Sequence, residues 1–455
     1  MAGTIALSKL SKPQRHNVGD TKDMISELPE GVLLYILSFL PTKDAVRTTI
    51  LAKTWRYLWT HLSVFDFEVF CYQHGSKEKH KSENCLIDQV DKLLQRSNCV
   101  ERLCIKVRGT IDAQKATSLL SSTLLHKVLD LKLSIEYINA MFVLPNSFSA
   151  SQSLHNLYLE FGFNLHIGDN ICFPSLKTLY LSSIRFANEK SGQRLLSGCP
   201  VLQELTMYRC SWLNVKQINV AMSTLRKLTI EFEGYSPLHI CTIKFDVGNL
   251  LSLSYTINPA INVFLVNPTS IVDESIHLGQ LYQYQQNEQL NIQSVIELLS
   301  RLSSVKTLSL SNYVLQYAKE TLHLLPSFDN LMHLDVFLGY LSPTTEALAS
   351  ILCKTPKLEV LHIYKRCNLF FDEAWSSNSL PCCFKSSLKL CFISNFHGYG
   401  DEIRSVKFLL ENATVLEYIN IFCSEYLLLN LKEMADVKNQ LQHLGLGRRC
   451  IIKFQ

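Results

Sequence analysis

Two patterns of hydrophobic positions divide this chain, one helical near the N-terminus and one strand-like over the rest. In the first, apolar residues recur at steps of three and four: Val32, Leu33, Ile36, Leu37 and Leu40. Pro29 suits a first helical turn, where its missing N–H is not needed. Because helices tend to stop before a proline, Pro41 is expected to end this helix.

Two further short helices are predicted in the same stretch. Thr42 is a suitable N-cap for the second helix. One face of this helix would carry Ala45, Val46, Thr49 and Ile50. The third helix is indicated by Trp55, Leu58 and Trp59. So short a bundle cannot bury all of these side chains itself, and a partner surface is expected to cover the remainder.

From residue 100 onward, short runs of alternating apolar residues predict half-buried strands. The runs begin at Val100, Val128, Leu154, Leu176, Leu202, Leu225, Leu250, Val305, Leu331, Leu358, Leu388 and Leu416. All steps but one lie between 22 and 30 residues, at or near the period of leucine-rich repeats. The exception, from Leu250 to Val305, is about two periods long, and Ser270–Gly279 is the candidate for the missing strand.

This period predicts one solenoid rather than several globular units. A single repeat cannot bury its own apolar face, but a stack of repeats can. We therefore expect an α/β fold, with a curved parallel sheet and return helices on the convex side. The last stretch, Leu380–Cys423, is interpreted as strand, loop, helix and strand, with the helix over Glu402–Glu411 and Asn412 as its stop. It would continue the solenoid and cap its open end.

Composition supports a folded protein of more than one part. The chain has 455 residues, of which 47% are hydrophobic and 18% charged. A net charge of +4 and a pI near 8.3 are too weakly basic to indicate a nucleic-acid-binding protein. No apolar run is long enough for a membrane span, and no secretory signal is visible. The 15 cysteines are therefore expected to be reduced, in a cytoplasmic and/or nuclear protein.

The N-terminal helical stretch resembles an F-box. The motifs are Leu28–Pro29, ILSFLPTKDAVRT from Ile36 and WRYLW from Trp55. The C-terminal stretch is similar to an FBD segment, with LPxC, SSLK, Phe396-x-Gly398 and VKFLLENATVLE. Together these motifs resemble the plant family with an F-box, leucine-rich repeats and an FBD segment, over nearly the whole chain. Ala52 and Thr54 depart mildly from the family's usual residues.

The resemblance implies a division of the chain and a function. The division is a flexible tail at 1–20, an F-box at 21–67, leucine-rich repeats at 85–375, and an FBD segment at 376–455 that continues and caps the solenoid. The function implied is substrate recognition in an SCF-type (Skp–cullin–F-box) ubiquitin ligase, without catalysis or cofactor. The F-box would bind a Skp-type adaptor and, through it, a cullin. The implied adaptor-binding residues are Leu28, Pro29, Leu33, Ile36, Leu40, Val46, Leu51 and Trp55. Some of these would instead hold the bundle together.

Two alternatives stay open at the level of sequence. One is a hormone-type small-molecule receptor, which would need basic side chains converging from neighbouring strands. The strand-adjacent basic residues are spread over many units: Lys106, Arg108, Lys132, Lys177, Lys227, Lys306 and Lys365. The other is an F-box scaffold that acts outside a ligase. The target protein cannot be read from one sequence.

Candidate chemical sites are few. No CxxC, HExxH, GxxxxGK[ST] or GxGxxG motif is present, and the adjacent Cys382 and Cys383 suit neither metal chelation nor redox exchange. Residues weighed and set aside as metal ligands or reactive thiols are His74, His80, Cys99 and Cys104. Trp212 and Trp375 follow repeat strands and are candidate binding anchors or packing residues.

The absence of these catalytic and metal-binding motifs leads to a prediction about the chemistry of the isolated chain. The isolated chain should form no thioester with ubiquitin, and metal analysis should find no stoichiometric zinc, because nucleophile and ligand constellations are missing. The measurements are a non-reducing gel after incubation with the charged conjugation enzymes, and elemental analysis of the purified chain. A ubiquitin thioester on any cysteine would contradict the prediction.

Overall fold

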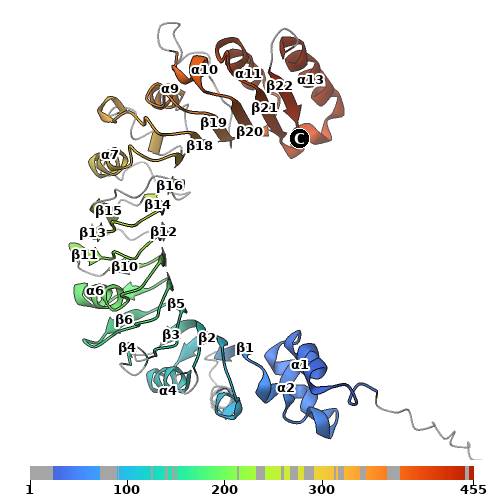
Figure 1. Cartoon of the computed structure of the whole chain (residues 1–455), viewed down its shortest axis with the longest axis vertical. Coiled ribbons are helices and arrows are strands. Elements are labelled where there is room, and N and C mark those ends of the chain that lie inside the picture. Colours follow the sequence, from blue (N-terminus) through green and yellow to red (C-terminus); the bar gives the residue numbers. More distant parts are fainter. Residues whose placement is uncertain are drawn as a thin grey trace, which may run out of the picture.

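A computed structural model shows a curved solenoid with a small helical module at its N-terminal end (Figure 1). It describes residues 24–71, 90, 92–123, 127–138, 142–145, 148, 151–212, 215–231, 241–257, 261–266, 275–280, 292–311, 314–315, 322–338, 345–365, 380–445 and 450–455. The expected tail at 1–20, the loop with His74 and His80, and Trp375 lie outside these residues.

The N-terminal module differs from the expected three helices in its second half. Its elements are α1 (Glu30–Ser38), α2 (Thr42–Arg47) and the 3-10 turns η1 (Thr48–Ile50), η2 (Lys53–Trp55) and η3 (Leu58–His61). The predicted third helix is therefore a pair of 3-10 turns. Thr42 is the first residue of α2 rather than its N-cap, a position taken by Pro41. The Thr42 hydroxyl instead accepts a hydrogen bond from the backbone N–H of Asp66, at 2.7 Å.

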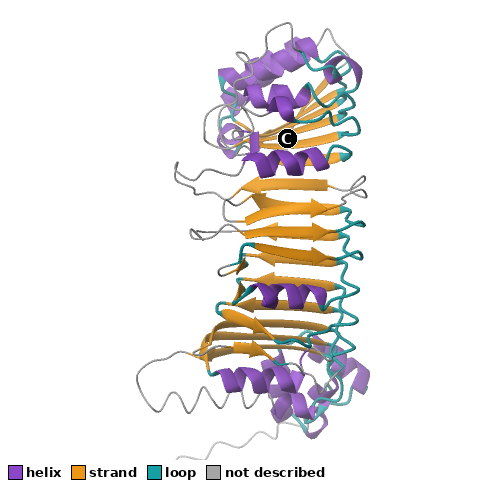
Figure 2. Cartoon of the chain, turned by 90° about the vertical axis from the view of Figure 1, so that its left-hand side faces the viewer, coloured by secondary structure: helices purple, strands orange, loops and turns teal. Residues whose placement is uncertain are grey.

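The predicted parallel sheet is confirmed. Its strands follow chain order, and every neighbouring pair is parallel. The strands are β1 (Val64–Cys71), β2 (Arg102–Ile111), β3 (Asp130–Ile138), β5 (Asn156–Phe161), β7 (Thr178–Ser182), β9 (Glu204–Tyr208), β12 (Lys227–Glu231), β14 (Ser252–Ile257), β16 (Ser275–Gln280), β17 (Thr307–Ser311), β18 (His333–Leu338), β19 (Val360–Lys365), β20 (Leu390–Phe396), β21 (Tyr418–Cys423) and β22 (Ile451–Phe454). Figure 2 shows these strands stacked side by side along the long axis.

Two strands of this sheet test the strand positions predicted from the sequence. β16 pairs with β14 and β17, so the missing strand expected within Ser270–Gly279 is confirmed. β1 was not foreseen as a repeat strand, yet it pairs with β2 over eight residues. The sheet therefore begins immediately after the helical module.

The convex side is a mixture of helices and short strands, whereas helices alone were expected. The helices and 3-10 turn of this side are α4 (Ala113–Thr123), α6 (Glu189–Ser197), α7 (Ile292–Arg301), η4 (Leu322–Leu324), α9 (Thr345–Leu352) and α10 (Cys383–Ser386). The strands form one sheet of β4 (Phe142–Leu144), β6 (Asn164–Ile167), β8 (Arg185–Phe186) and β10 (Ser211–Trp212), and another of β11 (Gln217–Ala221), β13 (Cys241–Asp246) and β15 (Ile261–Val266). In the described residues, the short units that begin at Leu154 and Leu202 return through strands alone. An extended segment covers the same distance with fewer residues than a helix.

The module and the solenoid share one hydrophobic core. Buried residues form a continuous cluster from Leu33 and Leu37 in α1 through the sheet to Leu441. The backbone carbonyls of Thr60 and Ser63 accept hydrogen bonds from the N–H groups of Asn98 and Glu101, at 2.9 and 2.8 Å. The F-box therefore has no core separate from that of the solenoid, and α2 packs against β1 at the junction.

The C-terminal end is closed by α11 (Gly400–Asn412), α12 (Glu425–Leu429) and α13 (Leu431–Gly445), at the top of Figure 1. A buried carboxylate organises the start of α11. Glu402, 1% exposed, accepts hydrogen bonds from the N–H groups of His397, Gly398 and Tyr399, at 2.8, 2.7 and 3.1 Å. Gly398 has φ of +82°, and a Cβ there would lie 2.9 Å from the Val437 side chain. The Phe396-x-Gly398 motif is thus explained by backbone geometry and close packing.

Removing this carboxylate should destabilise the C-terminal end. Glu402→Ala leaves three backbone amides without their charged acceptor, at a cost of about 3 kcal/mol in the free energy of unfolding. The control is Glu411→Ala near the end of the same helix, where an exposed carboxylate lies 3.9 Å from Lys407. It should cost less than about 1 kcal/mol. Urea unfolding followed by circular dichroism compares the two, and equal losses would contradict the assignment.

Candidate interaction surfaces

The N-terminal module carries a group of exposed apolar side chains on α1, on η1 and in their flanks. Of the predicted contact residues, Leu28, Ile36, Leu40 and Leu51 are 37%, 36%, 38% and 65% exposed, and Pro29 is also exposed. Solvent-exposed leucine and isoleucine in this number on so small a module indicate an interaction surface.

The other three predicted contact residues lie elsewhere. Leu33 and Trp55 are only 3% and 4% exposed, and Val46 is half-buried against the core. The Trp55 indole N–H also donates a hydrogen bond to the Ser26 hydroxyl, at 2.9 Å. Leu33 and Trp55 are core residues, since both belong to the continuous hydrophobic cluster that runs from the F-box into the sheet. Their side chains do not belong to the exposed surface.

Sequence reasoning missed several exposed residues of the same module. They are Met24, Ile25, Val32, Tyr35, Phe39, Ile50 and Tyr57. Tyr35 and Phe39 make an edge-to-face ring contact on α1, with centroids 4.8 Å apart. Their i, i+4 spacing is a signal that the sequence does contain. Ile50 was predicted to share one face of the second helix with Ala45 and Val46, and the 3-10 turn η1 leaves it 85% exposed.

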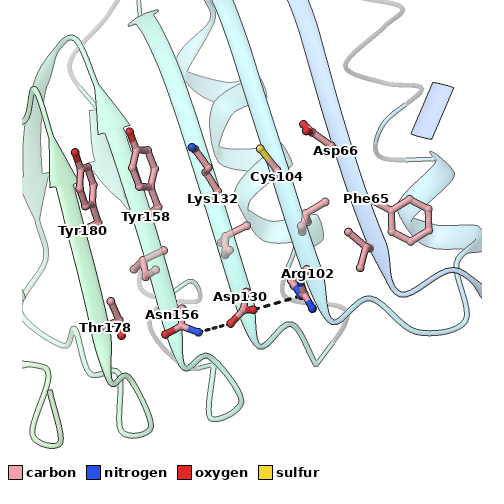
Figure 3. A pocket seen from close by; sticks show the side chains of 14 residues that line it. Phe65, Asp66, Arg102, Cys104, Asp130, Lys132, Asn156, Tyr158, Thr178 and Tyr180 are labelled. Atoms are coloured by element: carbon pink, nitrogen blue, oxygen red, sulfur yellow. Dashed lines mark hydrogen bonds and ion pairs between the residues drawn. The ribbon is translucent and has the colours of Figure 1, made fainter. Parts of the chain in front are cut away.

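The second surface is a trough on the concave face of strands β1 to β7, with a volume of about 440 Å³ (Figure 3). It is bordered by two rows of side chains from successive strands. One row is Arg102, Asp130, Asn156 and Thr178, and the other is Asp66, Cys104, Lys132, Tyr158 and Tyr180. Buried residues such as Leu103, Leu131 and Leu157 lie between the rows and point into the core.

The first row is a chain of paired polar groups. Arg102 lies 3.7 Å from Asp130, which also accepts a hydrogen bond from the Asn156 amide. These partners hold the side chains along one border of the trough. Figure 3 shows the three side chains joined in a line across adjacent strands.

The second row combines opposite charges with an aromatic platform. Tyr158 and Tyr180 stack with ring centroids 4.4 Å apart, and the Lys132 ammonium lies 4.3 Å from the Tyr158 centroid. Burial raises the pKa of Tyr158 to about 12, so its hydroxyl stays protonated at neutral pH. The repeats LHNLYL and LKTLYL place a tyrosine at the same position of consecutive units. That match is the sequence signal for the stack.

Cys104 is unsuited to nucleophilic chemistry. Burial and a hydrogen bond to Asp66 raise its pKa to about 11. The thiol is therefore protonated at neutral pH, in agreement with the interpretation of Cys104 as a structural residue. Cys99 and Cys382 are exposed. Among the described residues, no group of three or more His, Cys, Asp or Glu side chains has the arrangement of a metal site.

Trp212 is a packing residue rather than an anchor. It is 5% exposed and stacks on Phe186 within the convex strands, with centroids 5.3 Å apart. The basic residues weighed for a receptor site do not converge on the trough. Arg108 lies 3.4 Å from Glu68, and Lys227 lies on β12, outside the trough lining.

The C-terminal strands carry a second aromatic group on the concave face. Phe337, Tyr364 and His362 form a stack with successive centroid distances of 4.3 and 3.8 Å. His362 also lies 5.3 Å from Phe392, and its Nε2 is 2.9 Å from the Ser394 hydroxyl. Burial lowers the pKa of His362, an effect that the nearby Asp335 carboxylate opposes.

Comparison with known proteins agrees with this architecture. Three family models match: "F-box domain" at residues 25–67, "FBD-associated F-box protein At5g56370, LRR repeats" at 116–242, and "FBD" at 376–421. An Arabidopsis thaliana F-box/LRR-repeat protein, At4g14096, is 28% identical over 93% of this chain and 92% of its own length. A putative F-box/FBD/LRR-repeat protein of the same plant, At3g59240, is 29% identical over 93% of this chain and 87% of its own.

The fold and these matches define a protein with a helical docking module fused to a leucine-rich-repeat solenoid. Its matched domains are those of the F-box/leucine-rich-repeat/FBD family, in agreement with the resemblance seen in the sequence. Proteins of this family are typically non-catalytic adaptors. No helix in the described part of the chain is long and apolar enough to cross a membrane.

The pKa of His362 generates a prediction about pH. The imidazole has a lower pKa in the folded chain than in the unfolded chain, so the unfolded state takes up its proton first on acidification. The stability linked to His362 is present above the unfolded-state pKa and is lost as pH falls. His362→Phe, which keeps a ring in the stack, should reduce the fall in melting temperature between about pH 7.5 and about pH 5.5. An unchanged pH dependence would contradict this.

Proposed function

We propose that this chain is the substrate-recognition subunit of an SCF-type ubiquitin ligase. The F-box binds a Skp-type adaptor, the adaptor binds a cullin, and the concave face of the repeats holds a target protein for ubiquitination. The observation that carries the proposal is the exposed apolar surface of Leu28, Ile36, Leu40 and Leu51 on a matched F-box domain.

The adaptor-binding surface that we propose contains the exposed part of the predicted set together with neighbours. It consists of Leu28, Pro29, Ile36, Leu40, Ile50 and Leu51, with half-buried Val46 at its edge. Large apolar side chains that a partner desolvates are the usual source of binding energy in such interfaces. Leu33 and Trp55 are not part of this surface, but they anchor α1 and η2 in the shared core.

The shared core gives the proposal a mechanical basis. A substrate receptor must present its target at a constant position relative to the adaptor. The hydrogen bond between Thr42 of α2 and Asp66 of β1 joins the F-box to the first strand of the concave face. Because the apolar core also runs through this junction, the two surfaces belong to one body.

A small-molecule receptor is the second candidate, since the trough volume of about 440 Å³ falls in the range of small-ligand sites. Its charges favour this candidate less. Arg102 is paired with Asp130, so Lys132 alone among the trough residues offers a cation without an ion pair. The trough also crosses five strands rather than closing around one ligand.

The adaptor-binding test uses two matched substitutions in the full-length chain. Leu51→Glu places a charge on the proposed surface and should weaken binding to a Skp-type adaptor by about 30-fold or more. Leu429→Glu makes the same change at an 85% exposed leucine in α12, at the other end of the chain, and should leave binding unchanged. Affinity is measured by calorimetry, with circular dichroism melting to verify the fold.

Two results would overturn the proposal. One is adaptor binding by Leu51→Glu at wild-type affinity. The other is a wild-type chain that binds adaptor but retains no cullin when the complex is purified, which would favour a scaffold outside a ligase.

A further inference from the structure

The trough on β1 to β7 has the dimensions of a site for one extended polypeptide segment. Five strands spaced about 4.8 Å apart give it a length of roughly 19 Å, which about six extended residues span. Its two borders are two residues apart along each strand, or about 7 Å. A single extended chain fits this width, whereas a helix, about 10 Å across, does not.

The backbone beneath the trough offers little to such a segment. β2, β3, β5 and β7 are hydrogen-bonded to neighbours on both sides, and β1, at the edge of the sheet, pairs with β2. A segment that lies across these strands in the trough therefore cannot join the sheet as an extra strand. Recognition must come from the side chains of the two rows. In the first row, Arg102 and Asn156 both contact Asp130, so these side chains already have partners. Selectivity for a bound segment must therefore come from the second row.

The second row has a fixed order of chemical groups across the strands. Asp66 on β1 is a carboxylate, Lys132 on β3 is an ammonium, and Tyr158 and Tyr180 on β5 and β7 form a stacked platform. Asp66 and Lys132 are two strands apart, roughly 10 Å, which is about three residues of extended chain. Both charged side chains are exposed, while Cys104 between them is a neutral thiol.

We propose that the trough binds an extended segment of the target protein that carries a basic side chain opposite Asp66, an acidic side chain opposite Lys132 about three residues away, and an apolar or aromatic side chain on the Tyr158–Tyr180 platform. The inference rests on the proposed function, because it assigns the segment to the ligase target. Charge complementarity decides the occupant. An all-acidic segment would meet Asp66, an all-basic one would meet Lys132, and only mixed charge satisfies both.

The position of the trough adds a consequence for the whole receptor. Asp66 donates its backbone N–H to Thr42 of the F-box, so the first contact of the segment lies directly beside the adaptor-binding module. The bound segment is therefore held near the adaptor end of the solenoid rather than at the FBD end. Figure 1 shows β1 next to α1 and α2, with β2 on the other side of β1.

The test uses synthetic fluorescein-labelled peptides and the full-length chain in complex with its adaptor. One peptide carries Lys, then Glu three residues later, then Tyr, separated by glycine and serine. Its twin exchanges the Lys and the Glu. Both are also made in reverse order, since chain direction in the trough is free. The wild-type chain should prefer the first charge order over its twin by about tenfold in one direction.

The decisive variant is the double exchange Asp66→Lys with Lys132→Glu, which should invert the preference. Lys227→Glu, on the same concave face but outside the trough, should leave it unchanged. Raising the salt concentration should reduce the preference of the wild-type chain. Equal binding of the two peptides, no binding of either, or a preference that the double exchange leaves unaltered would each overturn the inference.

Failure here is separable from failure of the proposed function. The double exchange leaves the exposed F-box leucines in place, so adaptor binding should remain at wild-type level. A lost peptide preference with intact adaptor binding rejects the trough as the target site and leaves the ligase role standing. Adaptor binding that survives Leu51→Glu rejects the ligase role whatever the peptides do.

Discussion

Burial of alternate strand residues between the concave sheet and the convex layer is the constraint on which this structure depends. Leu205 and Met207 on β9, for example, are fully buried, while Thr206 between them faces the concave side. One unit with two such residues cannot exclude water, so each unit relies on its neighbours. The F-box obeys the same constraint, because its buried residues Leu33 and Trp55 belong to the cluster that continues into the sheet.

Because of this constraint, the residues that stabilise the fold differ from those that are available for recognition. The inward residues are fixed by packing and are leucine-rich in nearly every unit, whereas the concave residues are free to vary from unit to unit. Any selectivity of the concave face would therefore have to come from differences between equivalent positions. Asp66, Cys104 and Lys132 occupy one row of the sheet, yet they offer a carboxylate, a thiol and an ammonium. The same row reaches His362 and Phe392 at the C-terminal end, where the chemistry is aromatic.

The repeat pattern was predictable because strand alternation and period are local properties of sequence. They located most strands of the sheet and the degenerate strand β16. The first strand, β1, was missed because it follows the F-box motif directly and was counted with it. The mixed convex layer was missed because return segments carry no strong period. Leu33 and Trp55 were included in the predicted contact set because the apolar pattern alone does not separate residues of the bundle core from residues of its surface.

The trough could not be predicted from the sequence for a related reason. Its length, its two borders and the 4.3 Å contact between Lys132 and Tyr158 depend on the register of successive strands. Register is set by packing across units roughly 25 residues apart in the chain. The matching tyrosines of two consecutive repeats were visible, but their role as a platform required the neighbouring charges to be placed beside them.

We propose that one body carries an adaptor-binding F-box at its end and keeps its concave face free for a target. Hydrogen–deuterium exchange of the full-length chain with and without a Skp-type adaptor tests it most directly. Adaptor binding should slow exchange in α1, α2 and η1 and leave exchange in β3, β5 and β7 beneath the trough unchanged. Protection of those strands, or unchanged exchange in α1, α2 and η1, would contradict it.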